Sequence, residues 1–141
     1  MEEFYKLEDQ LCFPLYAASR LVTKCYQPVL DEMGITYPQY LALMVLWENN
    51  HINLGVLSDK LKLQSNTLTP LIKRMEETGL LNRARSDKDE RSIIISLTDK
   101  GSKLQSQAPK LHQRIRENLG INEQEAKELK RVLDKMILNL S

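Results

Sequence analysis

The sequence is poor in several features, and each scarcity excludes a class of protein. Only two of its 141 residues are cysteines, so a disulfide framework does not hold the fold together. No apolar run approaches the ~20 residues that a membrane-spanning helix needs. The acidic start, Met-Glu-Glu-Phe-Tyr-Lys, lacks the basic and apolar regions of a signal peptide. We therefore expect a cytoplasmic protein with reduced cysteines and no membrane partner.

Motifs of enzymes and metal sites are scarce as well. The chain has no Ser–His arrangement, no paired carboxylates placed for acid–base chemistry and no glycine-rich phosphate loop. Its two histidines, His51 and His112, have no Cys, Asp or Glu at metal-ligand spacing. We expect no enzyme, no metal site and no cofactor.

Charge is nearly balanced overall but unevenly distributed along the chain. The net charge is +1, yet residues 1–59 carry −5 while residues 60–100 and 101–141 carry +3 each. Phosphate contact requires positive charge, so this distribution weakly favours nucleic-acid binding by the central segment.

Hydrophobic periodicity and capping residues predict a mainly α-helical chain with one small β-hairpin. Thr36 with Gln39, and Asn122 with Glu125, have the spacing of capping boxes. Pro109 is expected to interrupt the helix that begins at Thr98. The expected helices cover residues 11–32 (after a short separate helix), 36–48, 54–61, 65–78, 98–119 and 122–140.

Apolar residues mark one face of the first long helix and the expected buried positions of the second. An apolar stripe along the first long helix consists of Leu11, Leu15, Ala18, Val22, Cys25 and Val29. The second helix is expected to bury Leu43, Met44, Leu46 and Trp47, and a short extended piece follows at residues 51–53.

The central segment has the order of a winged helix-turn-helix. A helix over residues 65–78, closed by Gly79, precedes two strands, 81–85 and 92–98, with a charged tip between them. In this fold the helix enters a DNA major groove and the hairpin reaches the neighbouring minor groove. We expect one domain over residues 1–141, with the winged region at 36–101 and dimerisation helices at 1–35 and 102–141.

A helical wheel separates the buried face of helix 65–78 from its reading face. Leu68, Leu71, Ile72 and Met75 cluster on the buried side. The candidate DNA contacts are Ser65, Asn66, Thr67 and Thr69, which suit base edges or phosphates, and Lys73 and Arg74, which suit phosphates. The competing interpretation is the solvated face of a structural helix.

The wing supplies further candidate contacts. Arg83 and Arg85 lie on its first strand. Asp89 lies two residues from Arg91 and is expected to hold it by a charge-assisted pair, so that Arg91 enters a narrow minor groove. The alternative is an ordinary hairpin tip of mixed charge.

The spacing Asp89-x-Arg91-x5-Leu97-Thr98-x2-Gly101 resembles that of the MarR family of bacterial winged-helix repressors. The segments Gln10-Leu-Cys12-Phe, Tyr26 and Ile35-Thr-Tyr37-Pro-Gln-Tyr40 narrow the resemblance to the organic hydroperoxide resistance repressors. It implies a homodimer on an inverted-repeat operator of double-stranded DNA. It further implies that organic hydroperoxides oxidise Cys12, that Tyr26 and Tyr37 of the other subunit contact this cysteine, and that oxidation releases DNA.

The spacing along the first helix agrees with contacts between subunits. Cys12 and Tyr26 are 14 residues apart, or about 21 Å on one helix, so only an antiparallel two-fold pairing of helices brings them together. Free N–H groups of a first helical turn and two phenol donors would stabilise a Cys12 thiolate. The alternative is a small thiol buried at a dimer interface.

Cys25 is expected in the core, about 20 Å from Cys12 along the same helix, which excludes a disulfide within that helix. Because no second cysteine lies near the C-terminus, the chain resembles the one-cysteine type, which implies a mixed disulfide of Cys12 with a low-molecular-weight thiol or its further oxidation. A bridge to Cys25 of the other subunit is a third alternative. Competing functions are a MarR-type regulator gated by a phenolic or drug-like ligand, a broad stress or virulence regulator, and a thiol peroxidase using Cys12. The peroxidase lacks support because the chain has no βαβ pattern and no Cys-x-x-Cys.

Overall fold

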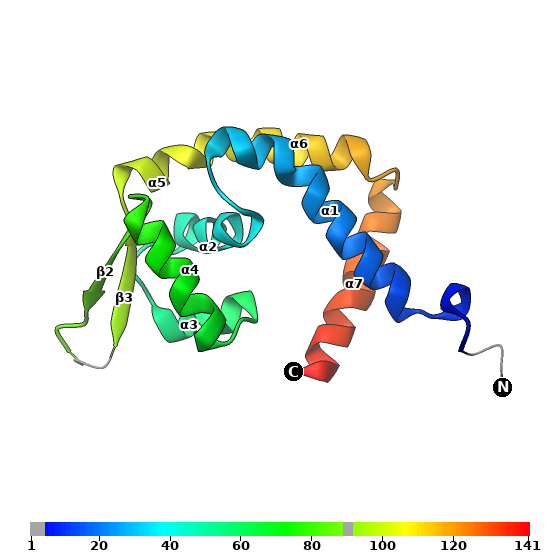
Figure 1. Ribbon diagram of the computed structural model, residues 1–141, viewed down its shortest axis with the longest axis horizontal. Coiled ribbons are helices and arrows are strands. Elements are labelled where there is room, and N and C mark those ends of the chain that lie inside the picture. Colours follow the sequence, from blue (N-terminus) through cyan, green and yellow to red (C-terminus); the bar gives the residue numbers. More distant parts are fainter. Residues whose placement is uncertain (1–4, 89–91) are drawn as a thin grey trace.

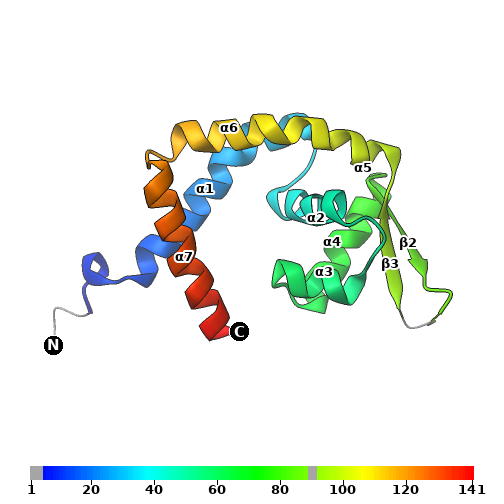
Figure 2. The same ribbon diagram turned by 180° about the vertical axis from the view of Figure 1, so that it is seen from behind.

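The computed structural model describes residues 5–88 and 92–141, in which helices dominate and a small sheet lies at one end (Figure 1). The two views agree that α2, α3, α4 and the sheet form one lobe, that α1 and α7 form the other, and that α6 connects them (Figure 2). In chain order the elements, with η for a 3-10 helix, are η2 (Leu7–Asp9), α1 (Cys12–Met33), α2 (Tyr37–Glu48), β1 (Ile52–Asn53), α3 (Leu54–Leu61), α4 (Ser65–Glu77), β2 (Leu81–Arg85), β3 (Ile93–Leu97), α5 (Asp99–Lys103), η3 (Leu104–Gln107), α6 (Ala108–Asn118) and α7 (Glu123–Leu140).

Capping residues explain where these helices begin and end. Thr36 accepts from the Gln39 N–H, and the Gln39 side chain accepts from the Thr36 N–H, which confirms the first predicted capping box. Asn122 and Glu125 form the second in the same way. Gly34, with φ of +72°, ends α1 in the left-handed conformation that glycine adopts without strain.

In α2, hydrophobic periodicity was insufficient to predict which side chains are buried. Leu43 and Leu46 are fully buried as predicted, and Trp47 is half-buried, but Met44 is 45% exposed, so its predicted burial was wrong. Apolar side chains cover almost every face of residues 41–46, and such a helix gives no periodic signal for its buried side.

The sheet is antiparallel with the order β1-β3-β2, so β3 lies in the centre. Its register pairs Leu81 with Leu97 and Arg85 with Ile93, and the two predicted wing strands are confirmed. β1 adds a third strand that is only two residues long. The preceding His51 has φ of +59° rather than the extended conformation expected for it.

The core lies beneath α4, between that helix, the sheet and α2. All four predicted side chains of α4 are buried: Leu68, Leu71, Ile72 and Met75. They pack in one cluster with residues of the other elements, including Leu30, Leu43, Leu46, Leu57, Leu81, Ile95 and Leu111. This packing fixes which face of α4 points outward.

A tight junction joins the end of α4 to the start of α5. The Thr98 hydroxyl donates to the Gly79 carbonyl at 2.6 Å and accepts from the Gly101 N–H at 3.1 Å. A Cβ atom on Gly101 would lie 2.2 Å from the Leu80 carbonyl oxygen, so only glycine fits there. Trp47 connects α2 to this junction, because its indole N–H donates to the Gly101 carbonyl at 2.9 Å.

The segment from α5 to α6 is helical but changes its winding. Between the two α-helices lies η3, in which the Ala108 N–H donates to the Gln105 carbonyl, the partner expected in a 3-10 helix. Pro109 occupies the first turn of α6, where its missing N–H leaves no donor unsatisfied. The predicted interruption by Pro109 is confirmed.

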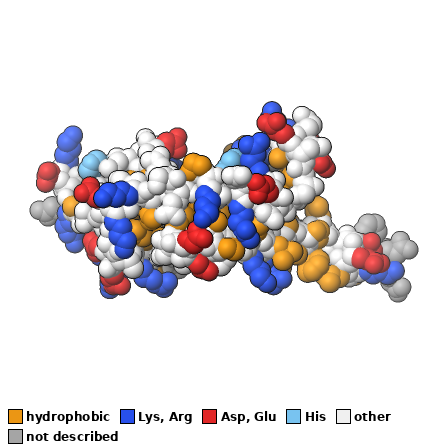
Figure 3. Space-filling model, turned by 90° about the horizontal axis from the view of Figure 1, so that it is seen from above, with side chains coloured by type: hydrophobic (Ala, Val, Ile, Leu, Met, Phe, Trp, Pro, Cys, Tyr) orange, Lys and Arg blue, Asp and Glu red, His pale blue; other side chains and the backbone are white. Residues whose placement is uncertain are grey.

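The lobe formed by α1 and α7 leaves much apolar surface uncovered. α7 buries none of its side chains, and on the apolar stripe of α1 Leu11 and Leu15 are 75% and 38% exposed. Hydrophobic side chains are visible on this end of the molecule (Figure 3). Within the described residues, no helix combines the length and apolarity that crossing a membrane requires.

Candidate DNA-binding surface and redox site

The outward face of α4 presents the predicted DNA contacts. All of the candidate residues are exposed: Ser65, Asn66, Thr67, Thr69, Lys73 and Arg74. The N-cap residue Gln64 makes no side-chain capping bond, whereas side chains cap α2, α3, α5 and α7. The first turn of α4 therefore offers hydroxyls, an amide and uncapped backbone N–H groups, a combination suited to phosphate oxygens and base edges.

The wing strand β2 carries two arginines in different surroundings. Arg85 is exposed. Arg83 is half-buried, and its guanidinium contacts Glu76 near the end of α4, with Nη2 at 3.0 Å and Nε at 3.2 Å from Oε1. The predicted pair of Asp89 and Arg91 lies outside the described residues.

Glu76 is held in its charged form by this contact. Hydrogen bonds from the Arg83 side chain are the largest influence, and they keep the pKa of Glu76 below its ordinary value of 4.5 against a smaller opposing effect of desolvation. Glu76 belongs to none of the motifs recognised in the sequence, although it lies seven positions before Arg83 of the predicted strand.

The proposed redox residues are spread over two helices, with Cys12 at the start of α1, Tyr26 in its second half and Tyr37 at the start of α2. Cys12 is exposed in the first turn, where no side chain caps the helix. Tyr26 lies near the other end, and its ring centroid is 4.9 Å from that of Tyr37 at the start of α2. The structure thus brings the two predicted tyrosines together and keeps both at a distance from Cys12 of the same chain, about 21 Å for Tyr26 by helical rise.

A third tyrosine, which the sequence reasoning did not assign, completes the aromatic cluster. Tyr40 lies 6.0 Å from Tyr26 and 6.2 Å from Tyr37 between ring centroids, and it also contacts Trp47 edge-on. Tyr37 and Tyr40 are three residues apart on one helix face, and this spacing was a signal available in the sequence.

The surroundings of Tyr26 favour its protonated form. Desolvation is the largest cause, followed by Tyr37, Tyr40 and Cys25, and together they raise the pKa of Tyr26 to about 12. Burial likewise raises the pKa values of Tyr37 and Tyr40. All three phenols therefore remain hydrogen-bond donors throughout the physiological range.

This shift predicts a pH dependence of stability. The folded pKa of Tyr26 lies above the ordinary value of 10, so its contribution is complete below pH 10 and is lost as the pH rises toward 12. We expect the tyrosinate absorbance titration of wild type, minus that of Tyr26→Phe, to show a component near 12. A difference titration centred at 10 would contradict the burial of this phenol.

Cys25 is half-buried rather than fully enclosed in the core as expected. Its carbonyl accepts a hydrogen bond from the Arg114 Nε at 2.8 Å, which ties α1 to α6 beside Tyr26. The thiol lies close enough to the tyrosine cluster to contribute to the raised pKa of Tyr26.

An apolar groove of about 570 Å³ runs between α1 and α7. The exposed part of the apolar stripe on α1 lines this groove, and Tyr37 lines it as well. The groove is continuous with the redox residues, because Tyr37 also belongs to the tyrosine cluster. The groove is lined by Leu11, Pro14, Leu15, Ala18, Ser19, Val22, Thr23, Tyr37, Leu129, Val132, Leu133 and Met136.

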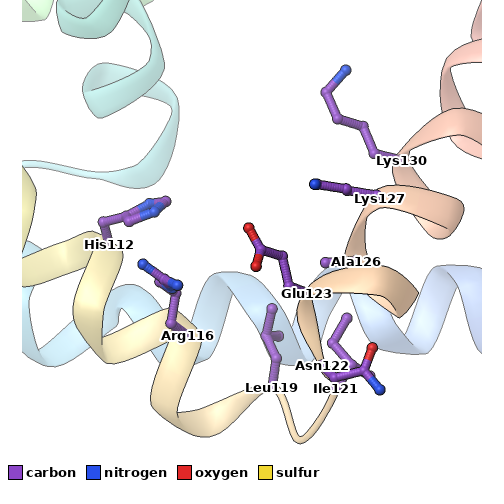
Figure 4. A pocket seen from close by; sticks show the side chains of 9 residues that line it. All are labelled: His112, Arg116, Leu119, Ile121, Asn122, Glu123, Ala126, Lys127 and Lys130. Atoms are coloured by element: carbon purple, nitrogen blue, oxygen red, sulfur yellow. The ribbon is translucent and has the colours of Figure 1, made fainter.

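A second hollow, of about 490 Å³, lies in the angle between α6 and α7. Figure 4 shows His112 and Arg116 on one wall, Lys127 and Lys130 on the other, and Glu123 between them. The excess of cations makes this angle electropositive. Within the described residues, no group of three or more His, Cys, Asp or Glu side chains could hold a metal ion.

Comparison with known proteins identifies relatives of this arrangement. The family described as Transcriptional regulator SarA/Rot matches residues 24–108. An organic hydroperoxide resistance transcriptional regulator of Bacillus subtilis is 50% identical over 127 residues, which cover 90% of this chain and 84% of the relative.

Solved structures show the same fold. Reduced AbfR bound to DNA, the AbfR protein being from Staphylococcus epidermidis, superposes with a TM-score of 0.80 and is 38% identical, covering 99% of this chain and 97% of that one. A MarR transcriptional regulator from Methanosarcina mazei superposes with a TM-score of 0.76 at 28% identity, covering 89% of this chain and 92% of its own.

Proposed function

Because this chain belongs to the MarR-type winged-helix transcriptional regulators, within which it matches the SarA/Rot family, we propose that it is a homodimeric repressor that releases DNA when an organic hydroperoxide oxidises Cys12. The observation that carries the proposal is the separation of Cys12 from the Tyr26–Tyr37 pair along α1. A second chain, related by a two-fold axis and paired through α1, brings the cysteine of each subunit to the tyrosines of the other.

The uncovered groove supports such a dimer. It extends from Leu11 near the start of α1 to Tyr37, and it is bordered by the exposed side chains of α7. Exposed apolar surface of this extent marks an interface with another molecule. Residues 1–35 and 102–141 would supply that interface, and residues 36–101 would bind DNA.

DNA binding is proposed to use one lobe of each subunit. The exposed face of α4 enters a major groove, with Asn66 and Thr69 directed at base edges and Lys73 and Arg74 at phosphates. Two symmetric lobes require two symmetric half-sites, so the operator is an inverted repeat.

The chemistry of sensing is a two-electron oxidation of sulfur. The Cys12 thiolate attacks the terminal oxygen of the hydroperoxide, the O–O bond breaks, and the sulfur becomes a sulfenic acid. The departing alkoxide takes a proton from a phenol of the partner subunit and leaves as an alcohol. Tyr26 can supply this proton because it is protonated at neutral pH, and the phenolate that forms, with a pKa raised to about 12, regains a proton from water.

The sulfenic acid then condenses with a low-molecular-weight thiol, which forms a mixed disulfide and releases water. Cys25 of the partner subunit is the competing thiol, and further oxidation by a second hydroperoxide is the third route. Each route alters the size or charge of the group packed against the tyrosines, and thereby the spacing of the two DNA-binding lobes. No catalytic turnover is proposed, since each cysteine reacts once until it is reduced.

A titration with cumene hydroperoxide tests this proposal. The duplex is first selected from a random-sequence pool by the reduced protein, and its affinity is then measured before and after oxidation. We expect wild type and Cys25→Ser to lose affinity by about tenfold or more, equivalent to the 1–3 kcal/mol typical of coupled sites, while Cys12→Ser retains its affinity.

Other outcomes would favour the other functions. Equal loss of binding in wild type and Cys12→Ser would reject Cys12 as the switch. Release by salicylate from Cys12→Ser would indicate a regulator gated by a phenolic ligand. Steady consumption of many equivalents of hydroperoxide per chain, with added thiol, would indicate a thiol peroxidase.

A further inference from the structure

Glu76 joins the recognition helix to the wing through three hydrogen bonds. Its Oε1 accepts from Nη2 of Arg83 at 3.0 Å and from Nε at 3.2 Å, and its Oε2 accepts from the backbone N–H of the same residue at 3.2 Å. One carboxylate therefore holds both the main chain and the side chain of Arg83. This is the only ion pair between α4 and the wing among residues 5–88 and 92–141.

The position of Arg83 in the sheet makes this contact consequential. β2 is an edge strand, since β3 lies between it and β1, and Arg83 is the middle residue of β2, opposite Ile95. Its N–H bonds to Glu76 and so points away from β3. The Glu76 carboxylate thus contacts the middle of the wing's free edge. A change in the angle between α4 and the wing at this contact would move the whole hairpin.

We propose that Glu76 and Arg83 are positioning residues for DNA binding, which fix the wing at a set angle to the recognition helix. Both elements must reach neighbouring grooves of one duplex at the same time, so their relative orientation limits affinity. The inference rests on the proposed function only in requiring that the chain binds DNA through α4 and the wing.

This role differs from the phosphate contact expected for Arg83. Two of its side-chain nitrogens already bond to Glu76, and the side chain is only 29% exposed. Arg85, two residues further along the same strand face, is exposed and remains the better candidate for a phosphate. The wing would then use one arginine for geometry and the next for contact.

The sign of a substitution separates positioning from simple electrostatics. Glu76 places a negative charge near a surface that binds a polyanion, so its neutralisation should strengthen DNA binding if charge alone matters. The positioning role predicts the opposite result. Glu77 is the matched control, because it is exposed on the same turn of α4 and forms no ion pair with any residue in the part of the chain that the structure describes.

The experiment measures duplex affinity of the full-length dimer across a salt series, with the selected duplex described above. We expect Glu76→Gln and Glu76→Asp each to weaken binding about tenfold, the effect of losing well-placed charge-assisted hydrogen bonds. Glu77→Gln should bind as tightly as wild type or more tightly. Glu76→Asp keeps the charge and shortens the reach, so its loss of affinity would arise from geometry.

Two further readouts distinguish positioning from a phosphate contact or a general loss of structure. The slope of log affinity against log salt should stay unchanged in Arg83→Gln, whereas loss of one phosphate contact in each subunit would reduce it by about 1.8 for the dimer, or about 0.9 for each contact. The double variant Glu76→Gln/Arg83→Gln should bind no worse than either single variant. Hydroxyl-radical footprints should lose protection at the flanking minor grooves and keep it in the centre.

The inference is overturned if Glu76→Gln binds as well as Glu77→Gln, if the two single losses add, or if the salt slope falls in Arg83→Gln. Each of these outcomes leaves the proposed function intact, since wild type still binds DNA. Failure of wild type to bind any selected duplex would instead reject the proposed function.

Discussion

Gly101→Ala is expected to destabilise the fold by about 3 kcal/mol or more, at the upper end of the range for overpacking. The added Cβ would lie 2.2 Å from the Leu80 carbonyl oxygen and 3.1 Å from Leu97 Cδ2. The first of these contacts is with backbone, which cannot rotate away as a side chain would. Relief requires α5 to move from the end of α4, and that movement breaks the Thr98 bond to Gly79.

Urea unfolding at fixed protein concentration measures this effect, because the stability of a dimer depends on concentration. Ser102→Ala is the matched control: the residue is the next one in α5, exposed, and its change should shift stability by less than about 0.5 kcal/mol. A Gly101→Ala protein as stable as Ser102→Ala would show that the junction is looser than described.

Leu129→Glu is expected to abolish dimerisation at micromolar concentration and to weaken DNA binding by about 100-fold or more, the scale of lost bivalent attachment. Leu129 lines the groove between α1 and α7 and is 51% exposed in the single chain. A carboxylate there meets water in the monomer, so the subunit fold is retained. In the dimer the same charge would be enclosed by apolar side chains, at a cost that pairing cannot offset.

Leu138→Glu provides a closely matched control, since it makes the same change on the same helix. Leu138 is 81% exposed and lies about 180° around α7 from Leu129 by the helical angle. Sedimentation and duplex affinity should match wild type for Leu138→Glu. If Leu129→Glu also remains dimeric and binds tightly, the groove is not the surface through which two chains pair.

Local signals in the sequence predicted most of the fold. The boundaries of α3 and β2 were predicted, and those of α4 and β3 were predicted to within one residue. Gly79 marks the end of α4 in a way that needs no tertiary context. The burial of Met44 was wrongly predicted because its helix is apolar on almost every face. The stripe on α1 was identified as apolar, but its exposure in the single chain was not predicted. Periodicity identifies an apolar face but does not say whether that face meets its own chain or another one.

The sites were predictable only in part. The sequence indicated Cys12, Tyr26 and Tyr37, and the structure brings the two tyrosine rings within 4.9 Å. The sequence did not indicate that Tyr40 joins the tyrosine cluster or that Glu76 bonds to Arg83. Both contacts depend on how separate elements meet in space. Counting basic residues on a strand also treats Arg83 and Arg85 alike, although their surroundings differ.

The 3-10 segment η3 sets the rotational relation between the two ends of the chain. A 3-10 helix turns about 20° more per residue than an α-helix and rises about 0.5 Å further, so the four residues of η3 add about 80° and 2 Å. Pro109 has no N–H for the Gln105 carbonyl, which accepts from Ala108 instead. The missing N–H of Pro109 thereby sets the rotation of α6 and α7 about the helix axis relative to the DNA-binding lobe. In a two-fold dimer, this rotation would set how the two lobes face successive turns of an operator.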